Sequence, residues 1–431
     1  MSLIVILDFD GVIVDSIKGL YNCFAKFLKE YGCEVDQKAF DRYNGMKLDD
    51  ILIDIKSRYK ISNSIKDLKK NYEKLMQDVY KESKLSSGVK EFLNYCDIHN
   101  ILVCVASGSK RKNLESVFDR FDLSNRFQFI ITADEVNEAK PNPEMFFKIK
   151  KKMGNGQYLV VDDSKNGLNA AIKAQMKPIY FTNNLNNSNY LSVSSFMELT
   201  SVITEYILKT QPEYKFKKIT TEIVPSNLIN SEEIDKYWNL TTKENPGLFN
   251  GSLFQVMSFS FKRSDQNIHL QLSKSDYKNL HFQNFFFKKK NKRRRSISLG
   301  VSGVVMNPEG MILVGRRKSN LYSYPNFLEL PPSGTIEPGR GNPEEQLILE
   351  LNEETGIKKE NISNIKPMIN YYDQKYSVLD IAYLIRLNCN FTLPKATEEY
   401  SELSFKEISK VKDIFHRESV VVTSKVLLNL L

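Results

Sequence analysis

Two carboxylates near the start of the chain have the types and spacing needed for chemistry. Asp8 and Asp10 follow the apolar run of residues 3–7 and precede Gly11. Side chains two apart on a strand point the same way, so we expect both at the carboxyl end of a buried strand, where open α/β sheets bind ligands. Paired charges need a cation, a proton or a substrate. A carboxylate nucleophile with a neighbouring acid and Mg²⁺ fits, whereas an Asp-Gly turn is the structural alternative.

Two later segments predict a site for a phosphoryl group. Residues 101–106 are apolar, predict a strand and end in Ser107-Gly108, just before a helical stretch. A hydroxyl beside glycine at that position suits a phosphate oxygen. Lys140 lies in the proline-rich turn of residues 140–143 and would add a positive charge.

A third predicted strand also ends in carboxylates. Residues 158–161 are apolar and lead into Asp162 and Asp163. Carboxylates from two strand ends can hold one Mg²⁺, which prefers oxygen ligands. Each segment alone is a weak signal, but their order along the chain favours a single site for phosphoryl transfer.

Together these segments resemble the haloacid dehalogenase superfamily of phosphatases, in its phosphoglycolate phosphatase and β-phosphoglucomutase-like branch. The resemblance covers roughly residues 1–208 and rests on DFDGVIVDS from Asp8, ASGSK from Ala106, AKPNPEMF from Ala139 and VVDDSKNGLNAA from Val160. It implies an α/β fold, with a doubly wound Rossmann-like parallel sheet and a helical cap over about residues 16–84. The dehalogenase branch lacks the second aspartate, so Asp10 favours phosphate chemistry.

The resemblance also implies roles for individual residues. Asp8 would become an aspartyl-phosphate, and Asp10 would protonate the leaving alcohol and then activate water. Ser107 and Lys140 would hold the phosphoryl group. The implied substrate-binding residues are Gly11, Gly108 and Lys47. The implied Mg²⁺ ligands are Asp8, Asp10, Asp162 and Asp163.

The cap region carries information about the reaction. Asn44-Gly-Met-Lys47 resembles the cap loop that approaches the phosphate in this branch. The sugar mutase of the branch has a histidine acid/base just after the first motif, but residues 17–21 contain none. This difference favours a simple phosphatase over a mutase.

The carboxy-terminal third predicts a second site. Residues 299–310 and 311–317 predict two strands around an Asn-Pro-Glu-Gly turn, and residues 343–355 predict a helix with Asn342 as its cap and Glu345 completing a capping box. On this helix three glutamates share one face, namely Glu350, Glu353 and Glu354. They could surround divalent cations, and a solvated acidic face is the alternative.

Residues 334–357 resemble the Nudix box, a loop-helix-loop that binds Mg²⁺ and cleaves nucleoside diphosphates linked to another group. The resemblance implies Glu353 and Glu354 as main metal ligands, Glu353 being catalytic, with Glu350 alongside and Mn²⁺ as a possible substitute. The chain departs from the pattern by an insertion around Arg340-Gly341, which also lacks the first glutamate, and by Leu349 in place of an arginine. Either Glu399 or Glu402 could activate water.

The region before the box is similar to the small domain that precedes the Nudix fold in UDP-glucose-cleaving hydrolases. We expect a linker over residues 209–218, a small β-rich domain over residues 219–295 and a Nudix α/β/α domain over residues 296–431. Trp238 and Phe249 belong to the similar stretch, although ordinary aromatic packing is an alternative. The implied substrate is a nucleoside diphosphate sugar, whose sugar phosphate product could pass to Asp8.

Composition limits the remaining possibilities. The net charge of +9 derives largely from residues 288–295, where seven of eight residues are Lys or Arg. A solvated basic loop is the favoured interpretation, and a nucleic-acid-binding regulator is an alternative. A non-catalytic Nudix module that senses nucleotide sugars or docks a partner is another. The five cysteines show no CxxC spacing, and we expect a cytoplasmic protein without a signal peptide or membrane span, of undetermined oligomeric state.

Overall fold

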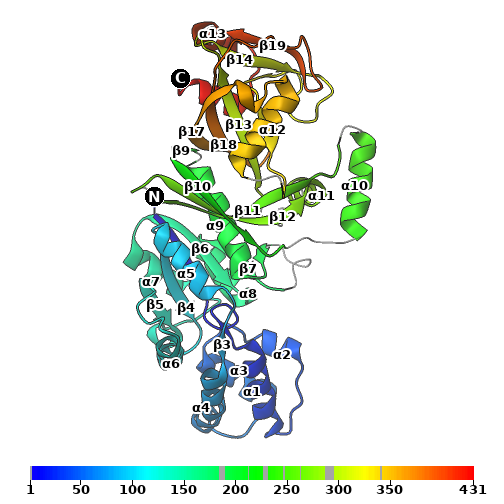
Figure 1. Ribbon diagram of the computed structural model, residues 1–431. Helices are drawn as coiled ribbons and strands as arrows, with labels where there is room; N and C mark the ends of the chain where they lie inside the picture. Colours follow the sequence, from blue (N-terminus) through cyan, green and yellow to red (C-terminus); the bar gives the residue numbers. More distant parts are fainter. Residues whose placement is uncertain are drawn as a thin grey trace. The chain divides into compact units, whose positions relative to one another are not determined.

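The computed structural model describes residues 2–183, 190–211, 213–226, 232–245, 248–262, 264–286, 296–339 and 342–431. The chain divides into two compact units, Met1–Leu199 and Thr200–Leu431, whose helices and strands are labelled in Figure 1. The basic run of residues 288–295 and the insertion at residues 340–341 lie outside the described residues.

A parallel sheet of six strands forms the centre of the first unit. Its strands are β1 (Ser2–Leu7), β4 (Leu102–Ser107), β5 (Phe129–Thr132), β6 (Gly156–Asp162), β7 (Lys177–Phe181) and β8 (Leu191–Val193). They lie in the order β5-β4-β1-β6-β7-β8, and every pairing is parallel. Because such a sheet is covered on both faces, its central strands are continuously apolar. Ile4 to Leu7 of β1 are fully buried.

The register of this sheet brings the three predicted motif strands to one edge. Leu7 of β1 is paired with Val105 of β4 on one side and with Val161 of β6 on the other. The residues after these positions therefore emerge together at the carboxyl ends. The strand order also reverses direction at β1, the topological point where such sheets bind ligands.

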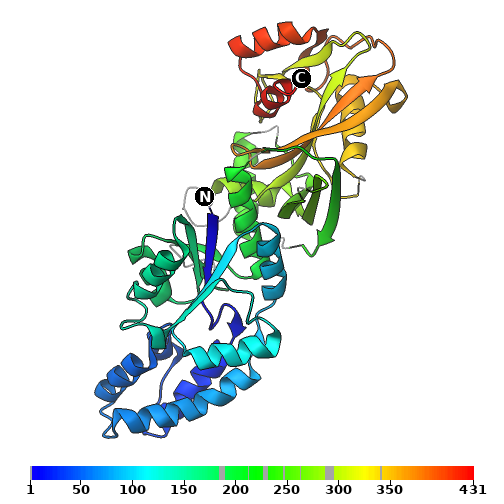
Figure 2. The same ribbon diagram turned by 90° about the vertical axis from the view of Figure 1, so that its left-hand side faces the viewer.

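Helices flank this sheet, as Figure 2 shows. They are α5 (Val89–Ile98), α6 (Arg111–Phe121), α7 (Glu144–Met153), α8 (Lys165–Lys173) and α9 (Phe196–Thr210). Apolar side chains of α7 and α8 pack on the sheet: Phe146 and Ala170 belong to one core cluster with Ile6 and Val160. The doubly wound α/β fold expected from the sequence is confirmed.

Four helices occupy the stretch expected to form a cap, and Figure 2 shows them gathered away from the sheet. They are α1 (Ile17–Lys29), α2 (Gln37–Asp41), α3 (Leu48–Arg58) and α4 (Ile65–Glu82). Their apolar faces meet through aromatic rings: Phe24 contacts Phe40 and Tyr43, and Phe27 contacts Tyr72. A short strand pair, β2 (Val14–Asp15) with β3 (Lys84–Leu85), joins the two chain segments that enter and leave the cap.

The second unit is built on one extended sheet. Its strands are β9 (Glu213–Tyr214), β10 (Lys218–Val224), β11 (Ser252–Lys262), β12 (Asn267–Asp276), β13 (Ser298–Met306), β14 (Ile312–Arg317), β15 (Leu328–Glu329), β16 (Ser333–Thr335), β17 (Ile362–Asp373), β18 (Val378–Leu387) and β19 (Tyr400–Lys406). Strand β11 pairs with both β12 and β13. The β-rich region that we expected as a small separate domain thus shares a sheet with the strands after residue 296.

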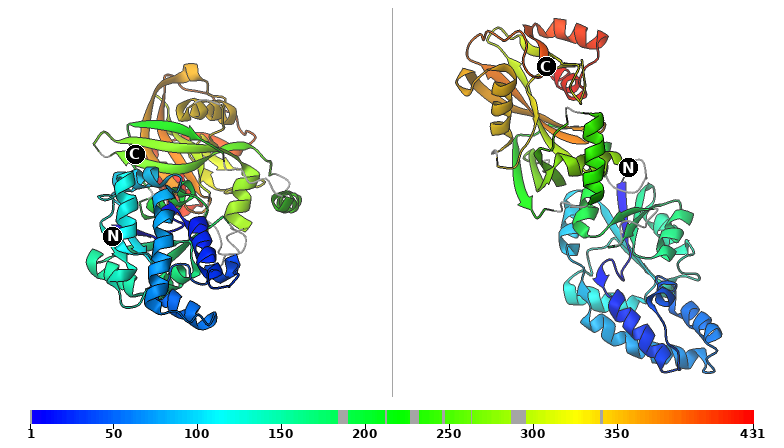
Figure 3. Two further views of the ribbon diagram at one scale, coloured as in Figure 1. Left: turned by 90° about the horizontal axis from the view of Figure 1, so that it is seen from below. Right: turned by 90° about the vertical axis from the view of Figure 1, so that its right-hand side faces the viewer.

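Helices cover both faces of the carboxy-terminal part of this sheet. They are α12 (Pro343–Thr355), α13 (Ile408–Arg417) and α14 (Val422–Leu428), whereas α11 (Tyr277–His281) packs on β11 and β12, and α10 (Glu232–Glu244) packs on α11. Leu347 of α12 belongs to one core cluster, whereas Val411 of α13 and Leu427 of α14 belong to another. Figure 3 shows α12 on one side of the strands and α13 and α14 on the other. This is the α/β/α arrangement expected for the carboxy-terminal region.

The division between the units lies inside a helix. It falls between Leu199 and Thr200 within α9, earlier in the chain than the boundary expected at residue 208. The expected linker over residues 209–218 contains the end of α9, all of β9 and the start of β10. Among the described residues, no helix has the length and apolar character to cross a membrane.

A buried histidine in the second unit has consequences for stability. His281 is 3% exposed, and its two ring nitrogens lie 2.8 Å from the Tyr237 hydroxyl and 2.9 Å from the Tyr322 hydroxyl. A neutral imidazole can donate to one hydroxyl and accept from the other. Burial lowers the pKa of His281 to about 4. Trp238, the only tryptophan, packs 6.0 Å from this ring.

We predict that the second unit loses stability as the pH falls. Between the folded pKa near 4 and the ordinary value of 6.5, the unfolded chain binds a proton at His281 that the folded chain does not, so the free energy of unfolding rises with pH. Going from pH 7 to pH 5 should cost about 2 kcal/mol, measured by urea unfolding followed through Trp238 fluorescence. His281→Gln should make the free energy of unfolding depend less on pH. His416→Gln, at an exposed position, is the control, and an equal slope in His281→Gln and wild type would contradict the assignment.

Candidate functional site

A buried lysine lies at the centre of the carboxyl edge of the first sheet. The Lys140 ammonium donates to Asp8 Oδ1 at 2.7 Å, to Asp162 Oδ2 at 2.8 Å and to the Ala106 carbonyl oxygen at 2.7 Å. The side chains of all three charged residues are at most 2% exposed. Segments from three parts of the sequence thus meet at one ammonium group, as the motifs predicted.

The two aspartates that follow β6 are placed differently. Both oxygens of Asp162 are engaged, because Oδ1 accepts from the Ser164 amide at 2.9 Å and hydroxyl at 2.6 Å, and Oδ2 accepts from Lys140. Asp163 accepts from the Asn44 side-chain amide at 3.0 Å through Oδ2, while its buried Oδ1 has no hydrogen-bond partner. Asp163 therefore has an oxygen left for a ligand, and Asp162 anchors Lys140.

The carboxylates of this site carry more charge than one lysine compensates. Oxygen atoms of Asp8, Asp162 and Asp163 all lie within 4.8 Å of one another. Burial, followed by neighbouring carboxylates, raises the pKa of Asp8 to about 7 and raises that of Asp163 well above its usual value. Burial alone would lower the pKa of Lys140, but Asp162 and Asp8 outweigh it and raise the pKa, so the lysine stays charged. A divalent cation at Asp8 and Asp163 would relieve the repulsion, and hard oxygen ligands suit Mg²⁺.

The Asp10 side chain lies outside this cluster and is held by hydroxyl groups. Oδ1 accepts from the Ser16 hydroxyl at 2.6 Å, and Oδ2 accepts from the hydroxyls of Ser109 at 2.7 Å and Tyr80 at 3.2 Å. Burial raises the pKa of Asp10. The carboxyl is therefore more readily protonated than an exposed aspartate, as an acid in catalysis requires.

The predicted phosphate loop lies directly beneath the predicted cap loop. Ser107 is fully buried, and its hydroxyl accepts from the Ser109 amide at 3.0 Å. A Cβ atom at Gly108 would lie 2.6 Å from the carbonyl oxygen of Gly45, so only glycine permits this approach. The Lys47 ammonium contacts the Val136 carbonyl oxygen at 3.3 Å. Gly11 closes the turn after Asp10 by donating its amide to the Val14 carbonyl oxygen at 2.8 Å.

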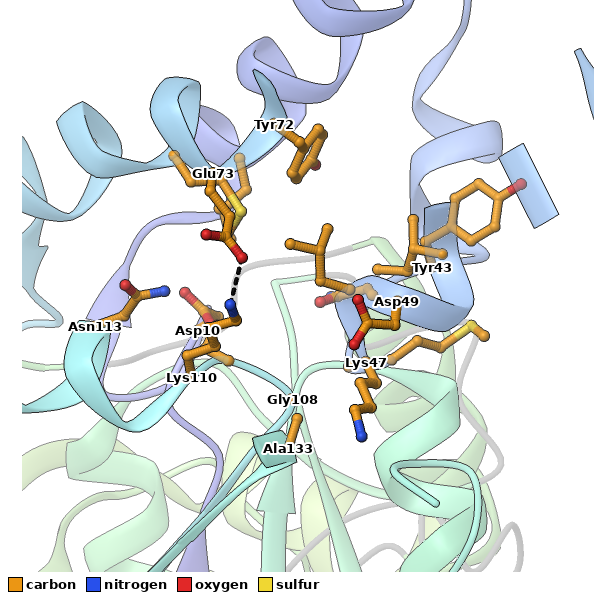
Figure 4. Close-up of a pocket in the computed structure, with 18 of the residues that line it drawn as sticks. Asp10, Tyr43, Lys47, Asp49, Tyr72, Glu73, Gly108, Lys110, Asn113 and Ala133 are labelled. Carbon is orange, nitrogen blue, oxygen red and sulfur yellow. Dashed lines mark hydrogen bonds and ion pairs between the residues drawn. The ribbon is translucent and has the colours of Figure 1, made fainter. Parts of the chain in front are cut away.

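A cavity of about 320 Å³ separates the cap from the sheet edge, and Asp8, Asp10 and Lys47 line it. Figure 4 shows Glu73 of α4 facing Lys110, with which it forms an ion pair, while Asp10 and Lys47 border the same space. A second pair on its cap side joins Lys69 to Asp49 at 2.5 Å. Paired carboxylates and ammonium groups therefore border the cavity that Asp8 and Asp10 also line.

In the second unit, the predicted helix begins and ends where its motif indicates. The Asn342 side chain accepts from the amides of Glu344 and Glu345, Pro343 is its first residue, and Gly356 follows its end in the left-handed conformation. This fixes which of the three predicted glutamates face the sheet. Glu354 is 4% exposed and Glu350 is half-buried, whereas Glu353 is exposed.

The inward-facing glutamates contact the loop before the helix. Glu354 accepts from the Ser333 amide at 3.1 Å, and its other oxygen lies 3.2 Å from the Tyr400 hydroxyl. A Cβ atom at Gly334 would lie 2.2 Å from Glu350 Oε1, which explains the glycine at the start of the motif. Burial raises the pKa of Glu350 to about 7 and that of Glu354 well above its usual value, and nearby carboxylates add to both shifts.

Two residues that the motif did not indicate complete this cluster. Glu329, at the end of β15, is buried and pairs with Arg317 at 2.5 Å, and its oxygens also accept from the Ser333 and Tyr400 hydroxyls. Arg317 lies 3.6 Å from Glu399, whose pKa is raised by burial. Of the two candidates for activating water, Glu399 is therefore beside the cluster, whereas Glu402 lies exposed on β19.

Several contacting residues had weak or no sequence signals. Tyr80 reaches Asp10 from a segment without a motif, whereas Ser109 belongs to the ASGSK motif but was not singled out, and only the tertiary fold brings both to Asp10. Glu329 could have been noticed as a carboxylate at the end of an apolar strand, directly before the Leu-Pro-Pro stretch. Arg317 could not have been chosen over Arg316 without knowing which face of β14 is covered.

Comparisons with known proteins agree with this geometry. The model of the haloacid dehalogenase-like hydrolase family matches residues 5–181, and the NUDIX domain model matches residues 297–422. A phosphorylated carbohydrates phosphatase of Thermotoga maritima is 25% identical over 41% of this chain and 83% of its own length. A mitochondrial (DL)-glycerol-3-phosphatase of Arabidopsis thaliana is 25% identical over 44% of this chain and 67% of its own length.

Among solved structures, β-phosphoglucomutase from Clostridium difficile is similar, with 25% identity and a TM-score of 0.43 over 48% of this chain and 96% of that protein. The family matches confirm both expected domains and their hydrolase character. This protein is therefore a hydrolase that joins a haloacid dehalogenase-like phosphatase domain to a NUDIX domain.

Proposed function

We propose that the protein is a bifunctional, Mg²⁺-dependent phosphohydrolase. Its first site would hydrolyse a small phosphate ester through an aspartyl-phosphate on Asp8, and its second site would cleave a nucleoside diphosphate sugar. The observation that carries the first part is the buried contact of Lys140 with both Asp8 and Asp162, beside an unpartnered oxygen of Asp163. This arrangement supports Asp8 as the nucleophile, with the Lys140 ammonium and a candidate metal ligand, Asp163, close to it.

The first chemical step would be attack by an Asp8 oxygen on the phosphorus of the substrate. The bond between phosphorus and the leaving oxygen breaks, and protonated Asp10 gives its proton to that oxygen, so an alcohol leaves. Lys140 and the amides around Ser107 would face the negative charge on the phosphoryl oxygens. The raised pKa of Asp10 supports its being protonated at this stage.

The second step would return the enzyme to its starting state. Asp10, now ionised, takes a proton from a water molecule, whose oxygen attacks the phosphorus of the aspartyl-phosphate. The bond to Asp8 breaks, and inorganic phosphate is released. Asp8 and Asp163 are the residues that would hold Mg²⁺, with Asp162 acting through Lys140. When bound, the ion would supply charge stabilisation for the phosphoryl oxygens.

We propose a small phosphorylated polyol or sugar as the substrate of the first site. The cavity of about 320 Å³ and its paired charged groups support a compact substrate rich in hydroxyls. The names of relatives, which include a phosphorylated carbohydrates phosphatase and a glycerol-3-phosphatase, support the same class. The absence of histidine from residues 17–21 supports hydrolysis over mutase chemistry.

We predict that Asp8→Asn abolishes phosphate release from sugar and polyol phosphates, lowering kcat on the order of 10³-fold or more, because the amide is a poor nucleophile. Colorimetric detection of inorganic phosphate with excess Mg²⁺ measures the effect. Asp78→Asn, at an exposed position on α4, is the matched control and should retain wild-type activity. Substantial turnover by Asp8→Asn would contradict the covalent mechanism.

For the second site, we propose that Glu350, Glu353 and Glu354 bind the divalent cation and that Glu399 activates water. The excess of carboxylates over Arg317 supports cation binding among the described residues of the cluster. A nucleoside diphosphate sugar as substrate is supported by the similarity of the stretch around Trp238 to the domain that precedes sugar-nucleotide-cleaving Nudix folds.

The alternative function for this half, a nucleotide-sugar sensor or docking module, has an observation in its favour. Leu349, where the motif has an arginine, is 40% exposed and supplies no partner to the glutamates. Glu353 is exposed as well. Calorimetric titration of a UDP-sugar with Mg²⁺ beside a turnover assay separates the two functions: binding without product favours the sensor.

We predict that Glu354→Gln lowers the release of nucleoside monophosphate from a UDP-sugar at least about 100-fold, and more than Glu353→Gln does. The reason is that Glu354 is buried in the cluster, whereas Glu353 is an exposed residue. Chromatographic quantification of the nucleotide measures both. Asn352→Asp is the control, because Asn352 is an exposed residue on the same helix. A larger loss in Glu353→Gln would contradict the order proposed from burial.

The two sites could also act in sequence, with the sugar phosphate released at the second site being dephosphorylated at Asp8. We predict that Asp8→Asn then still forms nucleoside monophosphate from a UDP-sugar but releases no inorganic phosphate, because only the second reaction is blocked. Measuring both products in one reaction decides the matter. Unchanged phosphate release in Asp8→Asn would exclude this sequence of reactions.

A further inference from the structure

The orientation of Asp10 depends on a tyrosine of the cap. The Tyr80 hydroxyl lies 2.7 Å from the Ser109 hydroxyl and 3.2 Å from Asp10 Oδ2, and Ser109 in turn contacts Oδ2 at 2.7 Å. The Tyr80 hydroxyl, the Ser109 hydroxyl and Asp10 Oδ2 therefore form a triangle of atoms within hydrogen-bond distance of one another. The other oxygen is held by Ser16 at 2.6 Å.

The members of this triangle come from different parts of the first unit. Tyr80 belongs to the last turn of α4, just before the chain leaves the cap, whereas Ser109 follows β4 in the sheet domain. Asp10 itself follows β1. The triangle can therefore exist only while the end of α4 is seated against the edge of the sheet.

The surroundings of Tyr80 fix its position. Tyr80 is 3% exposed, and its ring packs on the ring of Phe9 with 5.9 Å between the two centroids. Burial raises the pKa of Tyr80 well above its usual value, so the hydroxyl keeps its proton. A hydroxyl can both donate and accept, so Tyr80 and Ser109 can reorient their protons and serve Asp10 in its neutral and its ionised form.

We propose that Tyr80 is a positioning residue for the phosphatase reaction, whose hydroxyl, together with Ser109, holds the Asp10 carboxyl toward the leaving oxygen of the substrate. This inference rests on the proposed function of the first site. Tyr80 makes no contact with the reacting atoms in this account. In the step that forms the aspartyl-phosphate, its contribution is to proton donation by Asp10, so it affects substrates whose leaving group needs a proton.

Leaving-group dependence separates this role from ordinary packing. p-Nitrophenolate departs without a proton, whereas the phenolate of phenyl phosphate is more basic and gains more from protonation by Asp10. The ratio kcat/KM reports the step that forms the aspartyl-phosphate, in which this proton is transferred. A purely structural defect would lower kcat/KM for both substrates by a similar factor.

We predict that Tyr80→Phe, which keeps the ring and removes the hydroxyl, lowers kcat/KM about tenfold for phenyl phosphate and less than about twofold for p-nitrophenyl phosphate. Ser109→Ala should shift the ratio in the same direction and serves as a second variant. Tyr21→Phe is the matched control, because that cap tyrosine bonds only the Val35 carbonyl oxygen, at 3.4 Å, and it should leave both values unchanged. Thermal unfolding confirms that each variant is folded.

Equal loss for the two substrates, or no loss for either, in folded Tyr80→Phe would overturn the positioning role while leaving the phosphatase function intact. If the wild-type protein releases no phosphate from sugar, polyol or aryl phosphates in the presence of Mg²⁺, the proposed phosphatase function fails, and this inference fails with it. The two failures are therefore distinguishable in one set of assays.

Discussion

A buried ammonium group between two buried carboxylates is the interaction on which the first unit depends. Lys140 contacts Asp8 and Asp162 at 2.7 and 2.8 Å, with all three side chains removed from water. Loss of one partner of such a pair typically costs about 3–5 kcal/mol, because the remaining charge is left uncompensated. The site therefore depends on the sheet register that brings β1 and β6 side by side.

The same constraint explains why the aspartates around Lys140 differ in role. Asp162 uses both oxygens to hold Lys140 and the start of α8, so it contributes order. Asp163 keeps an oxygen without a partner, so it is available to a cation. Asp10 is held outside this cluster by three hydroxyl groups, which supports its proposed role in proton transfer. Asp162 and Asp163 thus supply an anchor and a proposed metal ligand, whereas Asp8 and Asp10 are the proposed nucleophile and proton donor.

The second unit also buries carboxylates, although a different set of charged groups surrounds them. Its buried carboxylates at Glu329 and Glu354 lie near Arg317, whose ion pairs among the described residues are with Glu329 and Glu399. Strand β14 supplies a positive charge through Arg317, whereas α12 carries Leu349 at the position where the Nudix motif has an arginine. Charge compensation there is incomplete within the described residues, and this supports the cation binding proposed for the second site.

The sequence predicted those parts of the fold and the candidate site that depend on local pattern. Apolar runs ending in Asp8, Ser107 and Asp162 predicted strand ends that the parallel register brings together, and the capping residues of α12 predicted its first and last residues. Tyr80 was not predicted, because 70 residues separate it from Asp10 and no local pattern links them. The continuity of the second sheet was missed for the same reason, since it depends on the pairing of β11 with β13. The preference for Glu399 over Glu402 rests on the contact of Glu399 with Arg317, which no local pattern indicates.

The central claim is that four separate segments form one pocket for a metal and a phosphoryl group around Asp8. Crystals of the protein grown with Mn²⁺ and measured near the manganese absorption edge test it most directly. The account predicts an anomalous peak in the first unit at about 2.2 Å from carboxylate oxygens of both Asp8 and Asp163. A first unit without a peak there, under conditions in which the protein hydrolyses phosphate esters, would contradict it.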